Sequence, residues 1–386
     1  MIAIIADDFT GAAEVAGICL GRGVTVSFIV NIPEVETLQA LDTQVVVLAE
    51  DTRSFTADGA EKISRMLAEK LKAAGISQVV KKIDSVLRGW VLPEMLALAQ
   101  VLGKSSLMIQ PANTATHRSI RQGLYYVEDT LLSKTSFSRD PDFPAGSSSV
   151  MELLHQRSQT SGGTPALPYE VPDAVTEQDL AACVSRCDDS VLAGGSADFW
   201  RVYLEAEIAA GRVRTVPVKD PPANSFPLTN CLLICGSAHQ NSLNFYQRLV
   251  ADGFPTMVMP ESLRGEEKPS DAEAIKWMDD CVAAWEKEHR LLIRVAPRPV
   301  IFPSCAERLR YRLTEAVYYI LQQITPSQLL IEGGATAWSL LQRLGWTSFN
   351  PVREWLPGVV QLQLKTPPYC YITLKPGSYA WPQFSF

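Results

Sequence analysis

The sequence predicts an α/β fold of two domains, each a three-layer arrangement in which helices cover both faces of a mainly parallel sheet. Three observations lead to this prediction. Short runs rich in Val, Ile and Leu alternate with helix-like segments at a spacing of roughly 20 to 30 residues, as in βαβ units. The apolar runs are nearly continuous, which is typical of strands buried on both faces. A proline-rich stretch with few apolar positions, residues 212–230, interrupts the series.

We therefore expect an N-terminal domain over residues 1–211, a linker over 212–230 and a C-terminal domain over 231–386, with a cleft between the domains. The strands expected in the first domain are residues 1–6, 24–30, 44–50, 78–83, 106–110 and 190–196. Its expected helices are residues 11–21, 57–74, 91–102, 150–155 and 198–209. Between residues 134 and 167 the pattern weakens and loop residues dominate.

In the second domain the alternation resumes. The expected strands are residues 231–237, 256–260, 291–295, 329–332, 359–364 and 369–374. The expected helices are residues 271–288, 306–323 and 337–344.

Composition and charge exclude several classes of function. The chain has 35 Lys and Arg against 42 Asp and Glu, and a net charge of -7 repels nucleic acids and anionic membranes. No apolar run approaches the ~18 residues that a membrane helix needs, and the start of the chain lacks the basic region of a signal peptide. Eight cysteines are too few for a disulfide scaffold. We expect a cytoplasmic protein that binds neither nucleic acid nor membrane; a homodimer is one open option.

Polar clusters follow three strands of the first domain. Asp7, Asp8 and Thr10 follow the first strand, Arg53 follows the third, and residues 81–89 (KKIDSVLRG) end the fourth. Because ligands of open parallel sheets bind beyond the carboxyl ends of the strands, these clusters are expected to converge on one crevice. Their composition fits an anionic, hydroxyl-rich small molecule. The alternative for Asp8 or Thr10 is a helix N-cap.

Glycine-containing turns end three strands of the second domain. They are Gly236-Ser237, Gly333-Gly334 and residues 375–378. Glycine at such a turn lets backbone N–H groups approach a phosphate at a helix N-terminus. None of the turns matches GxxxxGK[ST] or GxGxxG, and each alone could be a simple turn.

Taken together, these motifs resemble the four-carbon acid sugar kinase family. The similarity lies in ADDFTGA at residues 6–12, KKIDSVLRG at 81–89 and the stretch 118–144, which contains Arg118 and Gly123. It continues in GS at 236–237, GGATA at 333–337 and KPG at 375–377. The resemblance implies an ATP-dependent kinase acting on sugar acids such as threonate or erythronate. It further implies that the N-terminal domain holds the acid, the C-terminal domain holds ATP, and the cleft closes during turnover.

The resemblance also implies site residues. Those on the sugar-acid side are Asp8, Arg53, Asp84, Ser85, Val86, Leu87 and Arg88. Those on the nucleotide side are Ser237, Gly333, Gly334, Ala335, Thr336 and Gly377. Arg53 and Arg88 are expected to hold the carboxylate, and Asp84 or Asp8 to accept the hydroxyl proton. Lys82 is expected to neutralise charge on the phosphoryl group. The chemistry needs Mg²⁺, whose ligands the sequence does not identify.

Three positions depart from the family pattern. Val86 stands where the family usually has Thr, Ala335 where it usually has an acid, and His117 where it usually has Gly. Val86 and Ala335 leave open a second hypothesis, a catalytically impaired protein that senses a sugar acid or a nucleotide. A third hypothesis is a nicotinamide-dependent oxidoreductase, against which stands the missing GxGxxG motif.

Overall fold

The protein is described by a computed structural model. It describes residues 1–140, 142–158, 167–217, 226–236, 240–267, 270–296, 304–368, 370–377 and 379–385. The chain divides into two compact units, Met1–Val218 and Lys219–Phe386, and the boundary falls within the stretch 212–230. Each unit is an α/β layer structure, so the predicted fold class is confirmed.

The N-terminal unit is built on a sheet in which every pairing is parallel. In spatial order its strands are β2 (Val26–Val30), β3 (Val45–Ala49), β1 (Ile2–Ala6), β4 (Gln78–Lys82), β10 (Val191–Gly195), β5 (Ser106–Gln110) and β9 (Tyr169–Glu170). Strands β1, β2 and β3 are buried along their whole length, as expected of a parallel sheet covered on both faces.

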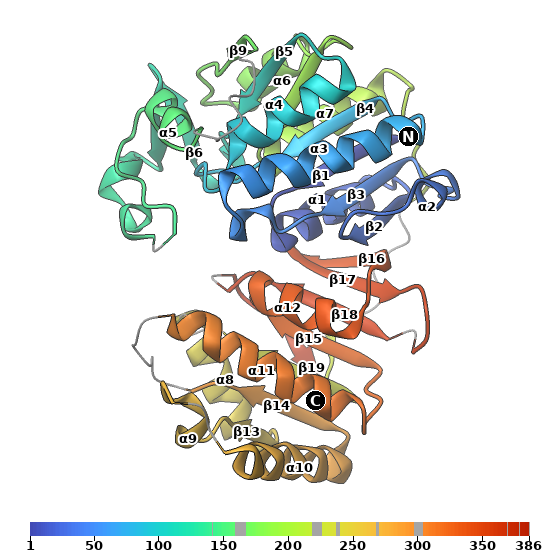
Figure 1. Cartoon of the computed structure of the whole chain (residues 1–386), viewed down its shortest axis with the longest axis vertical. Helices are drawn as coiled ribbons and strands as arrows, with labels where there is room; N and C mark the ends of the chain where they lie inside the picture. The colour runs from blue at the N-terminus through green and yellow to red at the C-terminus, as the bar shows by residue number, and fades with distance from the viewer. Residues whose placement is uncertain are drawn as a thin grey trace. The chain divides into compact units, whose positions relative to one another are not determined.

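Helices cover both faces of this sheet (Figure 1). They are α1 (Phe9–Gly21), α2 (Val35–Gln39), α3 (Ala57–Ala73), α4 (Val91–Leu102), α5 (Val150–Gln156), α6 (Glu177–Val184) and α7 (Ala197–Ala209). A Cβ on Gly194 would meet Met95 of α4, and one on Gly195 would meet Phe199 of α7. Because neighbouring residues of a strand face opposite sides, α4 and α7 lie on opposite faces of the sheet.

A small antiparallel sheet was not predicted from the sequence. It consists of β6 (Arg118–Arg121), β7 (Leu124–Val127) and β8 (Thr130–Leu131), and with α5 it lies to one side of the main sheet of its unit (Figure 1). Gln122 and Gly123 form its first turn with φ of 51° and 73°. Two successive positive φ values are typical of a type I′ hairpin turn, so the Gln-Gly pair was the overlooked signal.

The C-terminal unit has a mixed sheet that is mainly parallel. Its strands in spatial order are β13 (Thr256–Val258), β14 (Arg290–Arg294), β12 (Cys231–Cys235), β15 (Gln328–Glu332), β18 (Tyr371–Lys375), β17 (Val359–Leu364) and β16 (Ser348–Leu356). The first five run parallel, and β17 is antiparallel to both β18 and β16. Two short strands, β11 (Phe226–Pro227) and β19 (Phe384–Ser385), form a separate ribbon.

The helices of this unit are α8 (Gln240–Ala251), α9 (Glu261–Arg264), α10 (Asp271–Glu288), α11 (Cys305–Leu321) and α12 (Gly334–Leu344). Helix α8 was expected to follow the turn at Gly236-Ser237, although without bounds, and strand β16 was not among the predicted elements. Strand β16 contains Pro351 and alternates buried with exposed residues instead of forming an apolar run, which explains why it was missed. Within the described residues, no helix has the length and apolar character needed to cross a membrane.

A buried charge cluster lies under the carboxyl edge of the N-terminal sheet. The Lys81 ammonium lies 3.0 Å from Glu50 and 2.7 Å from Glu94, and all three side chains are almost completely buried. Burial disfavours the charge on Lys81, but the two carboxylates raise its pKa. Lys81 is therefore part of the framework, since its ammonium is already bonded to two carboxylates.

Replacing Lys81 by Met should cost about 3–5 kcal/mol of unfolding free energy, because it leaves two buried carboxylates without their cation. Urea unfolding of the two proteins measures this loss. Lys62→Met on the exposed surface is the control and should change stability by less than about 0.5 kcal/mol. A loss below about 1 kcal/mol for Lys81→Met would mean that the cluster behaves like a surface ion pair.

Candidate functional site

Asp8 lies two residues beyond the end of strand β1 and is the N-cap of α1. Its carboxylate accepts hydrogen bonds from the Gly11 backbone N–H at 3.1 Å and the Thr10 hydroxyl at 2.5 Å. The capping alternative is thus correct in part, although Asp8 also lies 3.4 Å from Arg53. A Cβ on Gly11 would come within 2.5 Å of the Asp8 carboxylate and 3.0 Å of the Lys82 ammonium. Glycine at position 11 therefore lets these two charged groups approach α1.

Arg53 joins three carboxylates at this edge of the sheet. Its Nη2 lies 2.9 Å from Asp7, 3.4 Å from Asp8 and 3.5 Å from Asp84. The Arg53 side chain is only 17% exposed. Burial disfavours its charge, but the three aspartates raise its pKa well above the usual range. The structure thus brings together Asp8, Arg53 and Asp84, as the sequence predicted for the polar clusters.

Asp84 is held by the turn that follows β4. It accepts hydrogen bonds from the backbone N–H groups of Val86 and Arg88, and from the Arg88 guanidinium at 3.1 and 2.8 Å. Burial alone would raise the pKa of Asp84, but Arg88, Arg53 and these hydrogen bonds lower it well below its usual range. Asp84 is therefore an ionised carboxylate at neutral pH, and its oxygens already have several donors.

The two arginines expected to hold the substrate carboxylate thus have carboxylate partners in the chain itself. Arg53 contacts the aspartates described above, and Arg88 binds Asp84 and lies 3.5 Å from Asp140. A ligand carboxylate would have to compete with these pairs.

Residues 85–87 contribute in different ways. The Ser85 hydroxyl accepts a hydrogen bond from Arg118. Val86 and Leu87 are buried, with only 2% and 1% of each residue exposed, so neither residue presents a surface to a ligand. The hydroxyl of a Thr at position 86, which is usual in the family, would accordingly lie in the protein interior. Leu87 has a positive φ of 61°, and its carbonyl accepts a hydrogen bond from Arg157.

Lys82 faces the side of the sheet that α1 covers. Its ammonium donates to the Ile83 carbonyl at 3.1 Å and lies 4.0 Å from the carboxylate of Glu14. Sequence reasoning missed Glu14, which lies on α1 two turns from the motif aspartates. Burial raises the pKa of Glu14, while the charges of Lys82 and Arg118 oppose the increase. Its side chain is 26% exposed, so Glu14 is an accessible carboxylate beside Lys82.

Asp7 was noted in the sequence but not assigned a role. One of its oxygens accepts two hydrogen bonds from Arg53, and the other is buried and has no hydrogen-bond partner among the described residues. Burial raises the pKa of Asp7 to about 6 despite the charge of Arg53, and the nearby Asp8 and Glu94 add to the increase. A Cβ on Gly89 would come 3.0 Å from Asp7, so the 84–89 turn packs directly on this carboxylate.

In the C-terminal unit, the three glycine-containing turns follow neighbouring strands. Cys235, Glu332 and Lys375, the last residues of β12, β15 and β18, pair in register. Gly236, Gly333 and Pro376 come next and therefore lie side by side. A Cβ on Gly236 would come within 2.5 Å of the Thr336 hydroxyl, so Gly236 allows this close approach.

The first turn of α12 carries most of the predicted nucleotide residues. Gly333 precedes the helix with φ of 97°, and its N–H donates to the Lys375 carbonyl. Ala335 is exposed in this turn and Thr336 is buried. Ser237 lies outside the described residues. The turn leaves N–H groups at a helix N-terminus, which is a favourable place for a phosphate.

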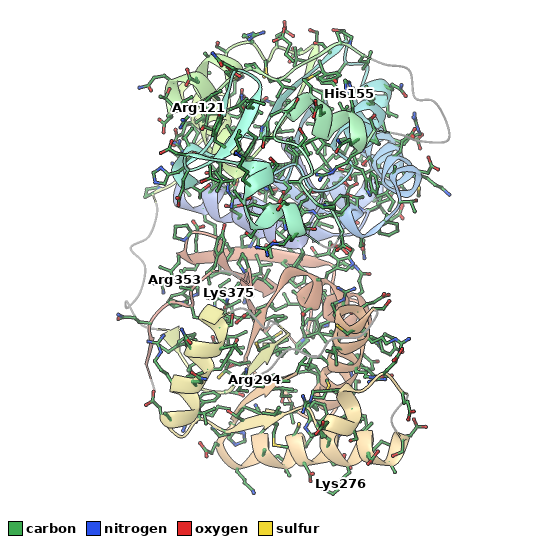
Figure 2. The ribbon with its side chains drawn as sticks, turned by 90° about the vertical axis from the view of Figure 1, so that its left-hand side faces the viewer. Arg121, His155, Lys276, Arg294, Arg353 and Lys375 are labelled. Atoms are coloured by element: carbon green, nitrogen blue, oxygen red, sulfur yellow. The ribbon has the colours of Figure 1, made fainter. Side chains whose placement is uncertain are left out.

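A charged row lies beneath these turns. Arg294, Cys235, Glu332 and Lys375 occupy equivalent positions on β14, β12, β15 and β18; Arg294 and Lys375 are labelled in Figure 2. Glu332 is fully buried and bonds Ser242, Tyr246 and Trp381, so it is not available as a metal ligand in place of the acid that Ala335 lacks.

Lys375, the fourth member of this row, donates to the carbonyls of Pro376, Gly377 and Tyr379 and lies 3.4 Å from Glu332. It thereby fixes the turn that carries Gly377. Within the described ranges, no group of three or more His, Cys, Asp or Glu side chains could hold a metal ion.

We compared the chain with known protein families and with characterised relatives. Residues 2–181 match a family model described as a sugar-binding N-terminal domain. A D-threonate kinase from Bordetella bronchiseptica is 33% identical over 193 residues, 46% of this chain and 48% of that protein. A 3-oxo-tetronate kinase from Cupriavidus necator is 24% identical over 428 residues, 100% of this chain and 95% of that protein. The N-terminal part of the chain is thus similar to this sugar-binding domain, and both of these relatives are named as kinases. The resemblance predicted from the sequence motifs is confirmed.

The match to the D-threonate kinase spans about half the length of that relative. Among solved structures, Haemophilus influenzae protein HI1011 aligns with a TM-score of 0.69 and 19% identity, covering 99% of this chain and 98% of that chain. At this identity, the structural likeness shows the shared fold.

The raised pKa of Asp7 predicts a pH dependence of stability. Folding favours the protonated form, so this contribution is present below the ordinary value of 3.8 and is lost as pH rises through about 6. The difference in unfolding free energy between wild type and Asp7→Asn should therefore fall by on the order of 2–3 kcal/mol as the pH rises from 3.8 to about 6. Urea unfolding across this range measures the difference. Asp42→Asn on the exposed surface is the control, and a difference that does not shrink would contradict the assignment.

Proposed function

We propose that this protein is an ATP-dependent kinase that phosphorylates a hydroxyl of a four-carbon sugar acid such as threonate or erythronate. The observation that carries the proposal is the convergence of Asp8, Lys82 and Asp84 around Arg53 at the carboxyl edge of the N-terminal sheet. Carboxylates with an adjacent lysine suit a ligand that carries both hydroxyl groups and negative charge. The names of the relatives, D-threonate kinase and 3-oxo-tetronate kinase, support the same substrate class.

In this proposal the N-terminal unit binds the acid. Asp8 and Asp84 orient its hydroxyls, the Ser85 hydroxyl adds a hydrogen bond, and Lys82 stabilises charge on the transferring phosphoryl group. Phosphoryl transfer depends mainly on positioning and charge stabilisation, so an aspartate with a low pKa can orient the nucleophile and accept its proton late. Glu14, whose pKa burial raises, is a further carboxylate that can accept this proton near Lys82.

The C-terminal unit binds ATP in this proposal. The N-terminal N–H groups of α12, with Gly333, Gly334, Ala335 and Thr336, would accept phosphate oxygens, and the turns at Ser237 and Gly377 would complete the site. The carboxylates of the acid site do not fit a resident metal, because Arg53 and Arg88 already neutralise them. Mg²⁺ would instead be bound largely by the ATP phosphates, where it neutralises their charge.

The proposal is tested by ADP release from Mg-ATP with D- and L-threonate, D- and L-erythronate and their keto relatives as acceptors. Turnover on one acid is expected, and Asp84→Asn should reduce it by about 100-fold or more because the hydroxyl loses its orienting carboxylate. Asp129→Asn on the exposed small sheet is the matched control.

Activity of Asp84→Asn within tenfold of wild type, about 1.4 kcal/mol in the barrier, would overturn the role of Asp84. Binding of an acid or of ATP without any turnover would favour the sensor hypothesis, since Ala335 replaces the acid usual at that position.

A second prediction concerns the nucleotide side. Lys375→Met removes the donor that holds the turn carrying Gly377, so ATP binding should weaken by about tenfold or more while threonate binding stays unchanged. Calorimetric titration of each ligand separates the two effects. Lys276→Met on the exposed face of α10 is the control (Figure 2).

The double variant Glu332→Gln with Lys375→Met removes both buried charges and serves as a test of folding. Equal loss of both ligands in a folded Lys375→Met protein would contradict the local role of Lys375.

A further inference from the structure

Among the described residues, Arg118 differs from the other arginines of the acid site, because neither a carboxylate nor a backbone carbonyl accepts from its guanidinium. Arg53 and Arg88 are paired with aspartates, and the buried Arg157 donates to the carbonyls of Leu87, Phe143 and Pro144. Arg118, the first residue of β6, donates through Nη1 to the Ser85 hydroxyl and lies over the Phe137 ring at 5.5 Å. Across the described part of the chain, no Asp or Glu oxygen lies within 4.0 Å of its nitrogens. Its Nε and Nη2 therefore remain available to a ligand.

The hydrogen bond to Ser85 places the Arg118 guanidinium at the acid site. Ser85, its partner, directly follows Asp84 in the turn after β4. Its charge also acts on Glu14, together with the charges of Lys82, Asp8 and Asp84. These groups come from α1, the end of β1 and the end of β4, so Arg118 faces the space that they share. The preceding His117 has φ of 54°, a conformation that glycine adopts more readily.

We infer that Arg118 binds the carboxylate of the sugar acid and makes the site selective for acids over neutral polyols; this inference rests on the proposed function. A guanidinium presents two parallel N–H donors that match the two oxygens of a carboxylate. Lys82, which lies on the same side, supplies a second positive charge. The small sheet β6–β8 then has a specific task, since it carries the arginine that recognises the charged end of the substrate.

The chain offers a matched control on the same strand. Arg121 lies three residues further along β6 and therefore points to the opposite face of the strand. It pairs with Asp129 at 3.2 Å and is 43% exposed; Figure 2 labels it. Arg121→Met removes one positive charge from the same small sheet without altering the acid site.

The test compares threonate with threonamide, its uncharged analogue, by calorimetric titration without ATP. Wild type should bind threonate at least tenfold more tightly than threonamide. Arg118→Met should lose about 100-fold in threonate affinity and leave threonamide nearly unchanged, so that the preference disappears. Arg118→Lys should restore part of the preference, because it keeps the charge and loses the paired donors. Arg121→Met should behave like wild type.

The role of Arg118 in supporting the turn is tested separately. Ser85→Ala removes the hydrogen bond between the two residues but keeps the guanidinium, so it should weaken both ligands by the same factor. If Ser85→Ala abolishes the preference for threonate as Arg118→Met does, Arg118 acts by holding the turn and the inference is wrong. The inference is also wrong if Arg118→Met retains the wild-type preference.

Failure of the proposed function is distinguishable from failure of this inference. A wild type that binds threonate through Arg118 but releases no ADP would refute the kinase and leave the carboxylate site intact. If the wild type turns over and Arg118→Met keeps the wild-type preference for threonate over threonamide, the inference alone is refuted. A wild type that binds none of the four-carbon acids would refute both.

Discussion

The contact of Arg53 with three aspartates is the interaction on which the candidate site depends. Asp7 and Asp8 follow strand β1, Asp84 follows strand β4, and one guanidinium offsets part of the negative charge that the three concentrate at the strand ends. Without this cation, the carboxylates would repel each other or take up protons, because burial disfavours each negative charge. Arg53 thus keeps Asp8 and Asp84 ionised and fixed before any ligand arrives, which is the condition for precise orientation of a hydroxyl.

Lysines near the strand ends of both units divide into two kinds. Lys81 is fully buried and bonded to Glu50 and Glu94. Lys375 is fully buried and paired with Glu332. These ion pairs stabilise the strand ends beneath the proposed ligand-binding edges of the two sheets. Lys82, in contrast, has a backbone carbonyl as its close partner and faces the carboxylates of the acid site. Neighbouring lysines of one motif therefore differ in role because successive residues of a strand face opposite sides of the sheet.

Much of the fold followed from local sequence patterns. The buried parallel strands were predicted because continuous Val, Ile and Leu runs identify them, and α10 was predicted over the residues it occupies. Strands β6–β8 and β16 were missed because short or partly exposed strands lack such a run. The convergence of Asp8, Arg53 and Asp84 was predictable from strand topology. The pairing of each arginine was not, because it depends on side chains distant in sequence, and so the importance of Arg118 and Glu14 emerged only from the structure.

The charged row of the C-terminal sheet has a consequence for how its strands align during folding. Arg294, Glu332 and Lys375 lie at matching positions of neighbouring strands. Arg294 and Glu332 contact Tyr246, and Lys375 lies 3.4 Å from Glu332. A slip of one residue in any of these strands would turn its charge toward the opposite, helix-covered face, away from every partner. The remaining apolar residues of these strands would tolerate such a slip far better, since they are buried on both sides. The ionic row therefore excludes misaligned sheets that hydrophobic burial alone would accept.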